Sequence, residues 1–487
     1  MYLGIDLGTS GIRAILMAQD GRVVAVAEQG YDVAHPHPGW SEQDPADWLA
    51  ACEASLGALR REAPEAWAQL RGIGLSGQMH GAVVLDKAGQ VLRPCILWND
   101  TRASDEAARL DGDADFRAIS GNIVFPGFTA PKLAWLARHE PDIFAKIDKV
   151  LLPKDYLRYW LTGEMAMDLS DAAGTSWLDV GARAWSDILL EKSGMRRAQM
   201  PPLLEGSAPA GALRADLAAQ WGLGRPVMVA AGGGDNAAAA CGTGCLSEGQ
   251  GFVSLGTSGV LLAARDAYAP APQTAVHTFC HALAGRWYQM GVILSATDAL
   301  NWLARSLGQS AEALSALTGA ALTPPSSVIF LPYLSGERTP HNNARIRGAF
   351  IGLDVSCGPA ELTRAVMQGV AFALGDSLEA LRETGAEPAA LLAIGGGARS
   401  QYWLRVLATV LDLPLEIPEA GELGAALGAA RLGQLAESGA APETILTRPA
   451  IAGVIEPDPK LRAAYGAAYA RYRALYPALE PFSRGPE

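Results

Sequence analysis

Two short turns of the sequence have the composition of phosphate-binding loops. Residues 6–12 read Asp-Leu-Gly-Thr-Ser-Gly-Ile, and residues 254–260 read Ser-Leu-Gly-Thr-Ser-Gly-Val. Glycine lets backbone N–H groups approach an anion closely, and the Thr and Ser hydroxyls add further donors. Two such turns facing each other across a cleft could hold a polyphosphate. Neither turn continues into the Gly-Lys-Ser/Thr of a Walker loop, and no dinucleotide fingerprint follows the first strand.

Two carboxylates and a third glycine cluster accompany these turns. Asp6 ends the first apolar stretch, and Asp235 follows three glycines at 232–234 after an apolar run over 226–231. Ligands of α/β proteins bind at the carboxyl ends of strands, so each carboxylate could meet a metal or a reacting proton. Each could instead cap its own turn or helix. Residues 395–398, Gly-Gly-Gly-Ala, lie between a strand and a helix, an arrangement that often faces a nucleotide.

A repeated set of strands and helices must position these residues. Short apolar stretches flank each Gly-Thr-Ser-Gly turn, which predicts a β-hairpin in each half, and residues 22–28 add a third strand to the first hairpin. Asp44 and Pro45 predict the start of a helix that runs to about residue 61. We also expect strands over 71–76, 81–85, 226–231, 328–331 and 391–394, and helices over 237–241, 359–384, 400–411 and 421–434.

The repeat predicts a duplicated architecture. Matched turns at the start of two similar segments favour two α/β lobes with mixed sheets, joined near the glycine-rich residues 242–251. We therefore expect an N-terminal lobe over 1–246 and a C-terminal lobe over 247–487. The small-residue helices near 236–241 and 424–430 are expected to pack closely at a hinge between the lobes.

Composition narrows the possible functions. The 487 residues carry 39 Lys and Arg against 51 Asp and Glu, a net charge of −12, which argues against a general nucleic-acid binder. The sequence contains neither an apolar run long enough to span a membrane nor an N-terminal secretory pattern. Six cysteines are too few for a disulfide framework, and Cys241 and Cys245 lack the companions of a zinc site. A cytoplasmic protein with reduced thiols and no membrane partner is expected, and a homodimer is left open.

At this point the sequence closely resembles the FGGY carbohydrate kinases over nearly its whole length. The resemblance rests on motifs in the same order and at comparable spacing. They are the hairpin at 6–11, Gly-Gln-Met-His-Gly at 77–81, Leu-Trp-Asn-Asp at 97–100, Gly-Phe-Thr-Ala-Pro-Lys-Leu at 127–133, Leu-Pro-Lys-Asp-Tyr-Leu at 152–157, Asp-Leu-Ser-Asp-Ala-Ala-Gly-Thr at 168–175, Gly-Asp-Asn at 234–236, Ser-Gly-Glu-Arg-Thr-Pro-His-Asn-Asn at 335–343, and Gly-Gly-Gly-Ala-Arg-Ser at 395–400.

This resemblance implies a fold and a reaction. The fold is a pair of duplicated actin/hexokinase-like, ribonuclease H-like lobes with a nucleotide and sugar cleft between them. The reaction is phosphoryl transfer from ATP to a sugar, and the motifs are most similar to those of members that phosphorylate D-xylulose at O5. The family's catalytic base corresponds to Asp235, and its acidic residue near Mg²⁺ corresponds to Asp6, which would hold the metal through water.

The resemblance also assigns the sugar-binding residues. Met79 and His80 stand where relatives that phosphorylate glycerol carry an Arg-Glu pair, so they are expected to leave room and an imidazole donor for a longer ketose. Asn236 supplies donors and an acceptor for sugar hydroxyls, and Trp98 is a candidate to stack on the sugar. From the residues alone, packing in the core is the simpler role for Met79, His80 and Trp98.

The nucleotide-binding residues follow in the same way. The resemblance places the phosphates at Thr9, Ser10 and Arg13 of the first hairpin and at Gly256 and Thr257 of the second. It places the adenosine at three residues near the third glycine cluster, which are Gly396, Gly397 and Gln401. It assigns no role to Arg338 or to the rest of the 337–343 loop.

Three other functions compete with this interpretation. A kinase of the same family could act on ribulose, L-xylulose or gluconate. An actin-like or Hsp70-like protein would use the same lobes without sugar chemistry, but the Met79-His80 and Asp235-Asn236 pairs argue against it. A sugar-dependent repressor would need a DNA-binding segment before the first strand, which is expected to begin at Tyr2.

Overall fold

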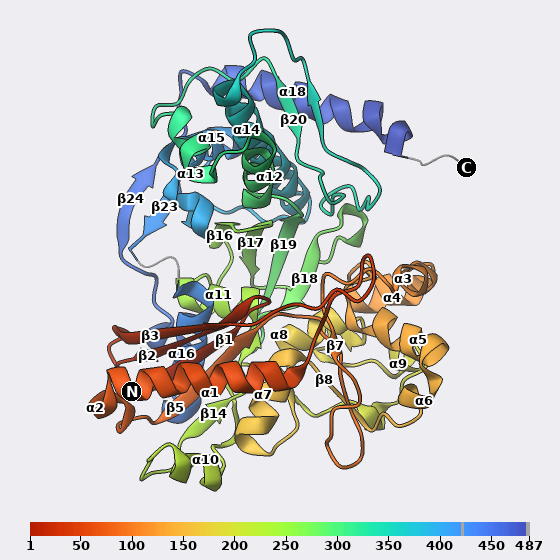
Figure 1. Ribbon diagram of the computed structural model, residues 1–487, viewed down its shortest axis with the longest axis vertical. Coiled ribbons are helices and arrows are strands. Elements are labelled where there is room, and N and C mark those ends of the chain that lie inside the picture. The colour runs from red at the N-terminus through yellow and green to blue at the C-terminus, as the bar shows by residue number, and fades with distance from the viewer. Residues whose placement is uncertain (420–422, 484–487) are drawn as a thin grey trace.

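The protein folds as two α/β lobes that lie one above the other in the computed structural model (Figure 1). The structure describes residues 1–419 and 423–483. The lower lobe contains a seven-stranded sheet in the order β13-β14-β5-β1-β2-β3, with β15 added to β5. Its strands are β1 (Tyr2–Leu7), β2 (Gly11–Met17), β3 (Val23–Gly30), β5 (Gly72–Gly77), β13 (Pro209–Ala212), β14 (Met228–Ala230) and β15 (Gly233–Gly234).

The upper lobe contains the second seven-stranded sheet, in the order β18-β19-β17-β16-β22-β23-β24. Its strands are β16 (Gly251–Leu255), β17 (Gly259–Arg265), β18 (His277–Cys280), β19 (Trp287–Ile293), β22 (Leu391–Ile394), β23 (Leu415–Pro418) and β24 (Ile451–Ile455). Two-stranded ladders complete the strands: β4 (Glu42–Gln43) with β7 (Cys95–Ile96), β6 (Val83–Leu85) with β8 (Lys149–Leu151), β9 (Met167–Asp168) with β12 (Leu203–Leu204), β10 (Leu178–Asp179) with β11 (Ala184–Trp185), and β20 (Ile329–Leu331) with β21 (Ala349–Ile351).

Helices surround both sheets. Those of the first half are α1 (Pro45–Glu62), α2 (Pro64–Trp67), α3 (Ser104–Asp111), α4 (Ala114–Ser120), α5 (Thr129–His139), α6 (Pro141–Phe144), α7 (Pro153–Thr162), α8 (Leu169–Ala172), α9 (Asp187–Lys192), α10 (Ala215–Gln220) and α11 (Asp235–Thr243). Those of the second half are α12 (Thr297–Leu307), α13 (Ala311–Leu317), α14 (Pro359–Arg382), α15 (Gln401–Leu411), α16 (Gly424–Ser438), α17 (Pro442–Ile445) and α18 (Arg462–Leu479).

The two sheets repeat the same strand pattern, which confirms the predicted duplication. In the lower lobe, β1 pairs antiparallel with β2 and parallel with β5, and β2 pairs antiparallel with β3. In the upper lobe, β16 pairs antiparallel with β17 and parallel with β22, and β17 pairs antiparallel with β19. Each Gly-Thr-Ser-Gly turn therefore closes the central hairpin of its own sheet.

Most predicted elements are present, with small shifts at their ends. The first helix begins as expected, because the Asp44 side chain caps it by accepting a hydrogen bond from the backbone N–H of Ala46 at 2.9 Å. The predicted strand over 226–231 shortens to β14. The predicted helix over 421–434 is α16, which starts at Gly424, and its first predicted positions lie outside the described residues. The helix predicted over 237–241 extends to Asp235–Thr243 as α11.

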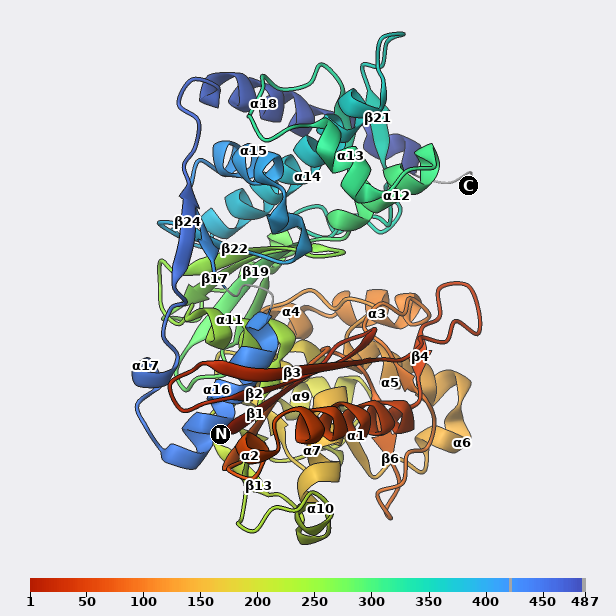
Figure 2. The same cartoon turned by 60° about the vertical axis from the view of Figure 1, so that its left-hand side comes forward.

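Helix α16 belongs to the second half of the sequence but packs in the lower lobe (Figure 2). It lies across β1 and β5 and against α11. A Cβ built on Gly428 would lie 1.7 Å from the carbonyl oxygen of Ala238, and one on Gly74 would lie 1.8 Å from that of Ala429. Only glycine fits such approaches between backbones. The close packing predicted for the two small-residue helices is confirmed.

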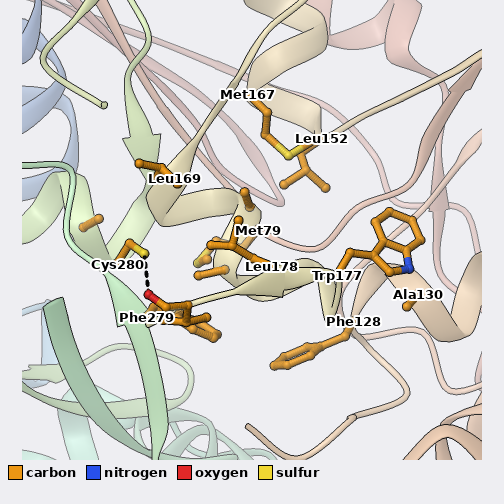
Figure 3. Packing of buried hydrophobic residues seen from close by; sticks show 14 of the residues in the cluster. Met79, Phe128, Ala130, Leu152, Met167, Leu169, Trp177, Leu178, Phe279 and Cys280 are labelled. Atoms are coloured by element: carbon orange, nitrogen blue, oxygen red, sulfur yellow. Dashed lines mark hydrogen bonds between the residues drawn. The ribbon is translucent and has the colours of Figure 1, made fainter. Parts of the chain in front are cut away.

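One hydrophobic cluster continues from the lower lobe into the upper one. It includes Met79 and Phe128 of the first half together with Phe279 and Tyr288 of the second. Figure 3 shows Met79 within this cluster, near Leu178. The lobes are thus joined through buried side chains on the β18 side as well as through α11 and α16.

Two further expectations concern the oxidation state of the cysteines and the presence of membrane-spanning helices. The six cysteines are free thiols, and all but Cys357 are buried. Among the described helices, none combines the length and apolar character needed to cross a bilayer.

Candidate active site

The proposed base, Asp235, lies where the lower sheet meets α11. It is the first residue of α11 and follows Gly234, which occupies the N-cap position. The alternative role of Asp235 as N-cap is therefore wrong, since its Oδ1 instead accepts hydrogen bonds from the backbone N–H and the Nδ2 of Asn236, at 2.7 and 2.9 Å. Burial raises the pKa of Asp235 to about 7, and the nearby charge of Asp6 adds to this shift. A carboxyl with this pKa can both accept and hold a proton near neutrality.

Asp6 lies on β1, close enough to Asp235 to influence its pKa. Its Oδ1 accepts a hydrogen bond from the Ser76 hydroxyl at 2.9 Å, and burial raises its pKa. The part of the chain that the structure describes holds no group of three or more His, Cys, Asp or Glu side chains arranged for a metal. Mg²⁺ is commonly held by one or two carboxylates, substrate phosphates and water, so Asp6 fits a site that a bound nucleotide would complete.

His80 is held in an unusual conformation beside the core. Its φ is +69°, a region that non-glycine residues rarely adopt. Its carbonyl oxygen accepts hydrogen bonds from Lys132 Nζ at 2.8 Å and from Thr129 Oγ1 at 3.1 Å. Its ring stacks on Phe128, with the centroids 4.4 Å apart. These contacts fix both the backbone and the ring of a side chain that is only 8% exposed.

The hydrogen bond of His80 Nδ1 corrects the expectation that this imidazole donates to the sugar. Nδ1 lies 2.8 Å from the carbonyl oxygen of Gly174, which can only accept, so Nδ1 carries the proton. Burial, reinforced by the charge of Lys132, lowers the pKa of His80 to about 3. The ring is therefore neutral at physiological pH, and Nε2 can accept a hydrogen bond from a hydroxyl group.

Met79 lies in the core and is 4% exposed. A Cβ on Gly234 would lie 2.9 Å from its Sδ, so Met79 packs directly against the residue that precedes Asp235. The hydroxyl of Tyr288 also approaches Sδ, at 4.0 Å. Met79 thus supports the turn that carries Asp235.

The first Gly-Thr-Ser-Gly hairpin is held by side-chain hydrogen bonds. Thr9 Oγ1 accepts a hydrogen bond from Trp98 Nε1 at 2.9 Å and donates one to Gln78 Oε1 at 3.2 Å. Trp98 is partly buried by this contact. Asp6, Ser10 and Arg13 line one hollow of about 300 Å³ beside the hairpin. Arg13 also pairs with Glu28 at 2.6 Å, so its side chain would have to leave a partly exposed ion pair to reach a phosphate.

The second hairpin presents Thr257 to solvent. The carbonyl oxygen of Gly256 accepts hydrogen bonds from the backbone and hydroxyl of Thr297, at 2.9 and 2.8 Å, and Ala296 N donates to the Thr257 carbonyl at 2.8 Å. These bonds anchor the turn to the start of α12. Thr257 at the tip is exposed.

The three residues expected at the adenosine lie together. Gly396, Gly397 and Gln401 line a pocket of about 610 Å³ between β22, α12, α13 and α15. Gly395, just before it, has φ +87° and lies against Leu255 of β16, so the glycine run allows the backbone to turn sharply there. The pocket is large enough for a nucleoside.

Sequence reasoning left several supporting residues without a role. Lys154 is fully buried and pairs with Asp155 at 2.5 Å and Asp168 at 2.8 Å. Asp168 Oδ2 accepts from the Ser170 hydroxyl at 2.5 Å, and Gly234 N donates to the same hydroxyl at 3.1 Å. This chain of contacts reaches the residue before Asp235. All of these residues except Gly234 belong to motifs at 152–157 and 168–175, but only the fold brings the two motifs together.

Comparison with known proteins identifies the family. The N-terminal domain model of the FGGY family of carbohydrate kinases matches residues 1–242, and the C-terminal domain model matches residues 251–437. The chain therefore belongs to the FGGY family of carbohydrate kinases and has its actin/hexokinase-like pair of lobes.

Several individual sequences and structures of this family are similar to the chain over nearly its whole length. The chain is 48% identical over 487 residues to the xylulose kinase of Escherichia coli strain K12, covering 99% of each sequence. A crystal structure of a xyloylose kinase from Brucella ovis has a TM-score of 0.96 and 59% identity, with 99% of each chain covered. A Plasmodium falciparum glycerol kinase structure with ADP shares the fold, with a TM-score of 0.86 at 20% identity and coverage of 96% and 97%.

Proposed function

We propose that this protein transfers the γ-phosphoryl group of ATP to O5 of D-xylulose, with Asp235 as the general base. The relatives named as xylulose kinases, similar over their whole length, support the sugar. The observation that carries the mechanism is the position of Asp235, a carboxyl with a pKa of about 7 at the start of α11 and near Asp6. The proposed lobes are residues 1–246 and 247–487, with α16 of the second segment packed on the lower sheet.

The reaction then proceeds in one displacement. O5 attacks the γ-phosphorus and its proton passes to the Asp235 carboxylate. The bond from phosphorus to the β-phosphate oxygen breaks, and ADP leaves with the electron pair. Asp6 would hold Mg²⁺, which would supply positive charge to offset the negative charge of the phosphates. The two hairpins supply N–H and hydroxyl donors to the phosphates.

His80 and Asn236 position the sugar in this proposal. His80 Nε2 accepts a hydrogen bond from a sugar hydroxyl, and the Asn236 amide lies beside the base, which its Nδ2 already contacts. A neutral acceptor held by Gly174 and Phe128 suits a sugar hydroxyl better than an anion. Gly396, Gly397 and Gln401 hold the adenosine in their shared pocket.

A sugar panel tests the proposal. Release of ADP is measured with D-xylulose, D-ribulose, L-xylulose, gluconate and glycerol, and NMR locates the phosphate on the product. We expect the highest kcat/KM for D-xylulose and the phosphate on O5. A higher kcat/KM for another sugar, or a phosphate on another oxygen, would contradict the substrate assignment.

A further inference from the structure

The consecutive residues Glu337 and Arg338 line a cavity between the two lobes. The cavity has a volume of about 430 Å³. Trp98 and Phe125 of the lower lobe line one side, and Thr257, Leu294 and Arg338 of the upper lobe line the other. Residues separated by more than 200 positions in the sequence thus share one cavity.

Arg338 brings a positive charge to this cavity without a carboxylate partner. Its guanidinium lies 4.8 Å from the centre of the Phe125 ring, and its Nη1 lies 3.4 Å from His277 Nε2. Within residues 1–419 and 423–483, no carboxylate oxygen lies within 4.0 Å of its nitrogens. Burial lowers the pKa of Arg338 to about 10, which still leaves it charged at neutral pH.

The neighbouring Glu337 uses its carboxylate for contacts with backbone N–H groups rather than for an ion pair with the Arg338 guanidinium. Its Oε1 accepts hydrogen bonds from the backbone N–H groups of Leu294 and Arg338, at 3.1 and 2.8 Å, while its Oε2 has no hydrogen-bond partner among the described residues. Burial raises the pKa of Glu337 to about 8, against the opposing effects of these backbone hydrogen bonds and of the Arg338 charge. The cavity therefore contains a partly buried cation that forms no ion pair among the described residues. Asp100 and Asp298 also line the cavity, and Asp100 pairs with Arg102.

The residues proposed to bind the phosphates and those proposed to bind the sugar both lie near this cavity. On the phosphate side, Thr257 lines the cavity directly, and Trp98 donates its Nε1–H to Thr9 of the first hairpin. On the sugar side, the ring of His277 lies 5.7 Å from that of Phe128, which stacks on His80. Arg338 stands where the sugar and phosphate sides meet.

We propose that Arg338 binds the phosphoryl group in this cavity, either as the γ-phosphate of the nucleotide or as the phosphate of the product. A partly buried cation without an ion-pair partner is stabilised best by an anion, and a neutral sugar hydroxyl would leave its charge uncompensated. The guanidinium forms no covalent bond. It donates N–H groups to the non-bridging oxygens while the O5–phosphorus bond forms and the bond to ADP breaks. This role rests on the proposed function.

Three variants separate this role from a structural one. Arg338→Met removes the charge, and Arg338→Lys keeps a charge without the planar fork of donors. Arg345→Met removes an exposed arginine of the same loop and serves as the matched control. Melting temperatures show whether each variant folds.

We expect Arg338→Met to lower kcat about 100-fold or more, in the range of a lost electrostatic donor, with the KM for D-xylulose within about threefold of wild type. Arg338→Lys should retain part of the activity, and Arg345→Met should match wild type. If Arg338→Met does not fold, Arg338→Lys carries the test, with kcat lowered about tenfold or more.

Calorimetry identifies which phosphoryl group is bound. The ligands are D-xylulose, D-xylulose 5-phosphate and a non-hydrolysable ATP analogue. We expect Arg338→Met to weaken the product or the ATP analogue about tenfold or more and to leave D-xylulose unchanged. Equal weakening of D-xylulose and its phosphate, or a lower melting temperature alone, would overturn the inference. If wild type fails to phosphorylate D-xylulose, the proposed function fails, while the ATP-analogue measurement still tests Arg338.

Discussion

At the scale of single residues, the ionisation of Asp235 controls when a proton acceptor is available. The free carboxyl has a pKa near 4, but burial and the charge of Asp6 raise the pKa of Asp235 to about 7 in the folded protein. The pH profile of kcat/KM reports the free enzyme. We expect kcat/KM for D-xylulose to rise as pH increases through about 7 and to level off above about 8. A profile that is flat between pH 5.5 and 8 would contradict this role of the carboxylate.

The same raised pKa affects stability. The folded state binds more protons at Asp235 than the unfolded state between about pH 4 and 7, so stability falls as pH rises through this window. Asp235→Asn has no titrating group at this position, so its stability should not fall in this way as pH rises. We expect the melting temperature of the variant to exceed that of wild type at pH 8, with a free energy of unfolding higher by about 1–3 kcal/mol. Both differences should shrink at pH 5. A variant less stable than wild type at both pH values would contradict this account.

His80 is the second residue whose role can be measured. Asn tolerates the positive φ at this position and lacks the imidazole acceptor, so His80→Asn removes the acceptor with little backbone strain. We expect a loss of about 1–3 kcal/mol in kcat/KM for D-xylulose, and an unchanged KM for ATP. His139→Asn, on the exposed end of α5, is the control. A lower melting temperature with unchanged kinetics would make His80 a structural residue only.

At the scale of elements, the packing of α16 on α11 and on the lower sheet attaches the second half of the chain to the lower lobe. Gly428→Ala would place a Cβ 1.7 Å from a backbone carbonyl oxygen that cannot move aside easily, whereas Gly466 on α18 has open space around it. We expect Gly428→Ala to destabilise the protein by about 3 kcal/mol or more and Gly466→Ala to stabilise it by about 0.5–1 kcal/mol. Similar melting temperatures for the two variants would show that the helices can separate without cost.

The elements were largely predictable from the sequence, and the contacts between distant segments were not. The Asp44 cap and the two glycine turns are local patterns, so the first helix and the hairpins could be placed. Asp235 is a possible N-cap in the sequence because Asp often fills that position, but Gly234 takes it, and the Asp235 carboxyl contacts Asn236 instead. The packing of α16 on the lower sheet and the Lys132 contact to His80 depend on the tertiary fold, which no local pattern encodes.

At the scale of the whole molecule, the two phosphate hairpins lie on different lobes, so neither lobe completes the site alone. Closure on substrates would also exclude water that could accept the phosphoryl group. We expect small-angle scattering to show a smaller radius of gyration with D-xylulose and a non-hydrolysable ATP analogue together than without ligands. Identical scattering profiles would contradict closure.

The central claim is that Asp235 is the base for phosphoryl transfer to D-xylulose, and the most direct test is the kcat of Asp235→Asn. The variant keeps the shape of the side chain but cannot accept the O5 proton at neutral pH. We predict that kcat at pH 8 falls about 10²–10⁴-fold, while calorimetry shows near wild-type affinity for D-xylulose and the ATP analogue. A kcat close to that of wild type, in a variant that still folds and binds, would contradict the account.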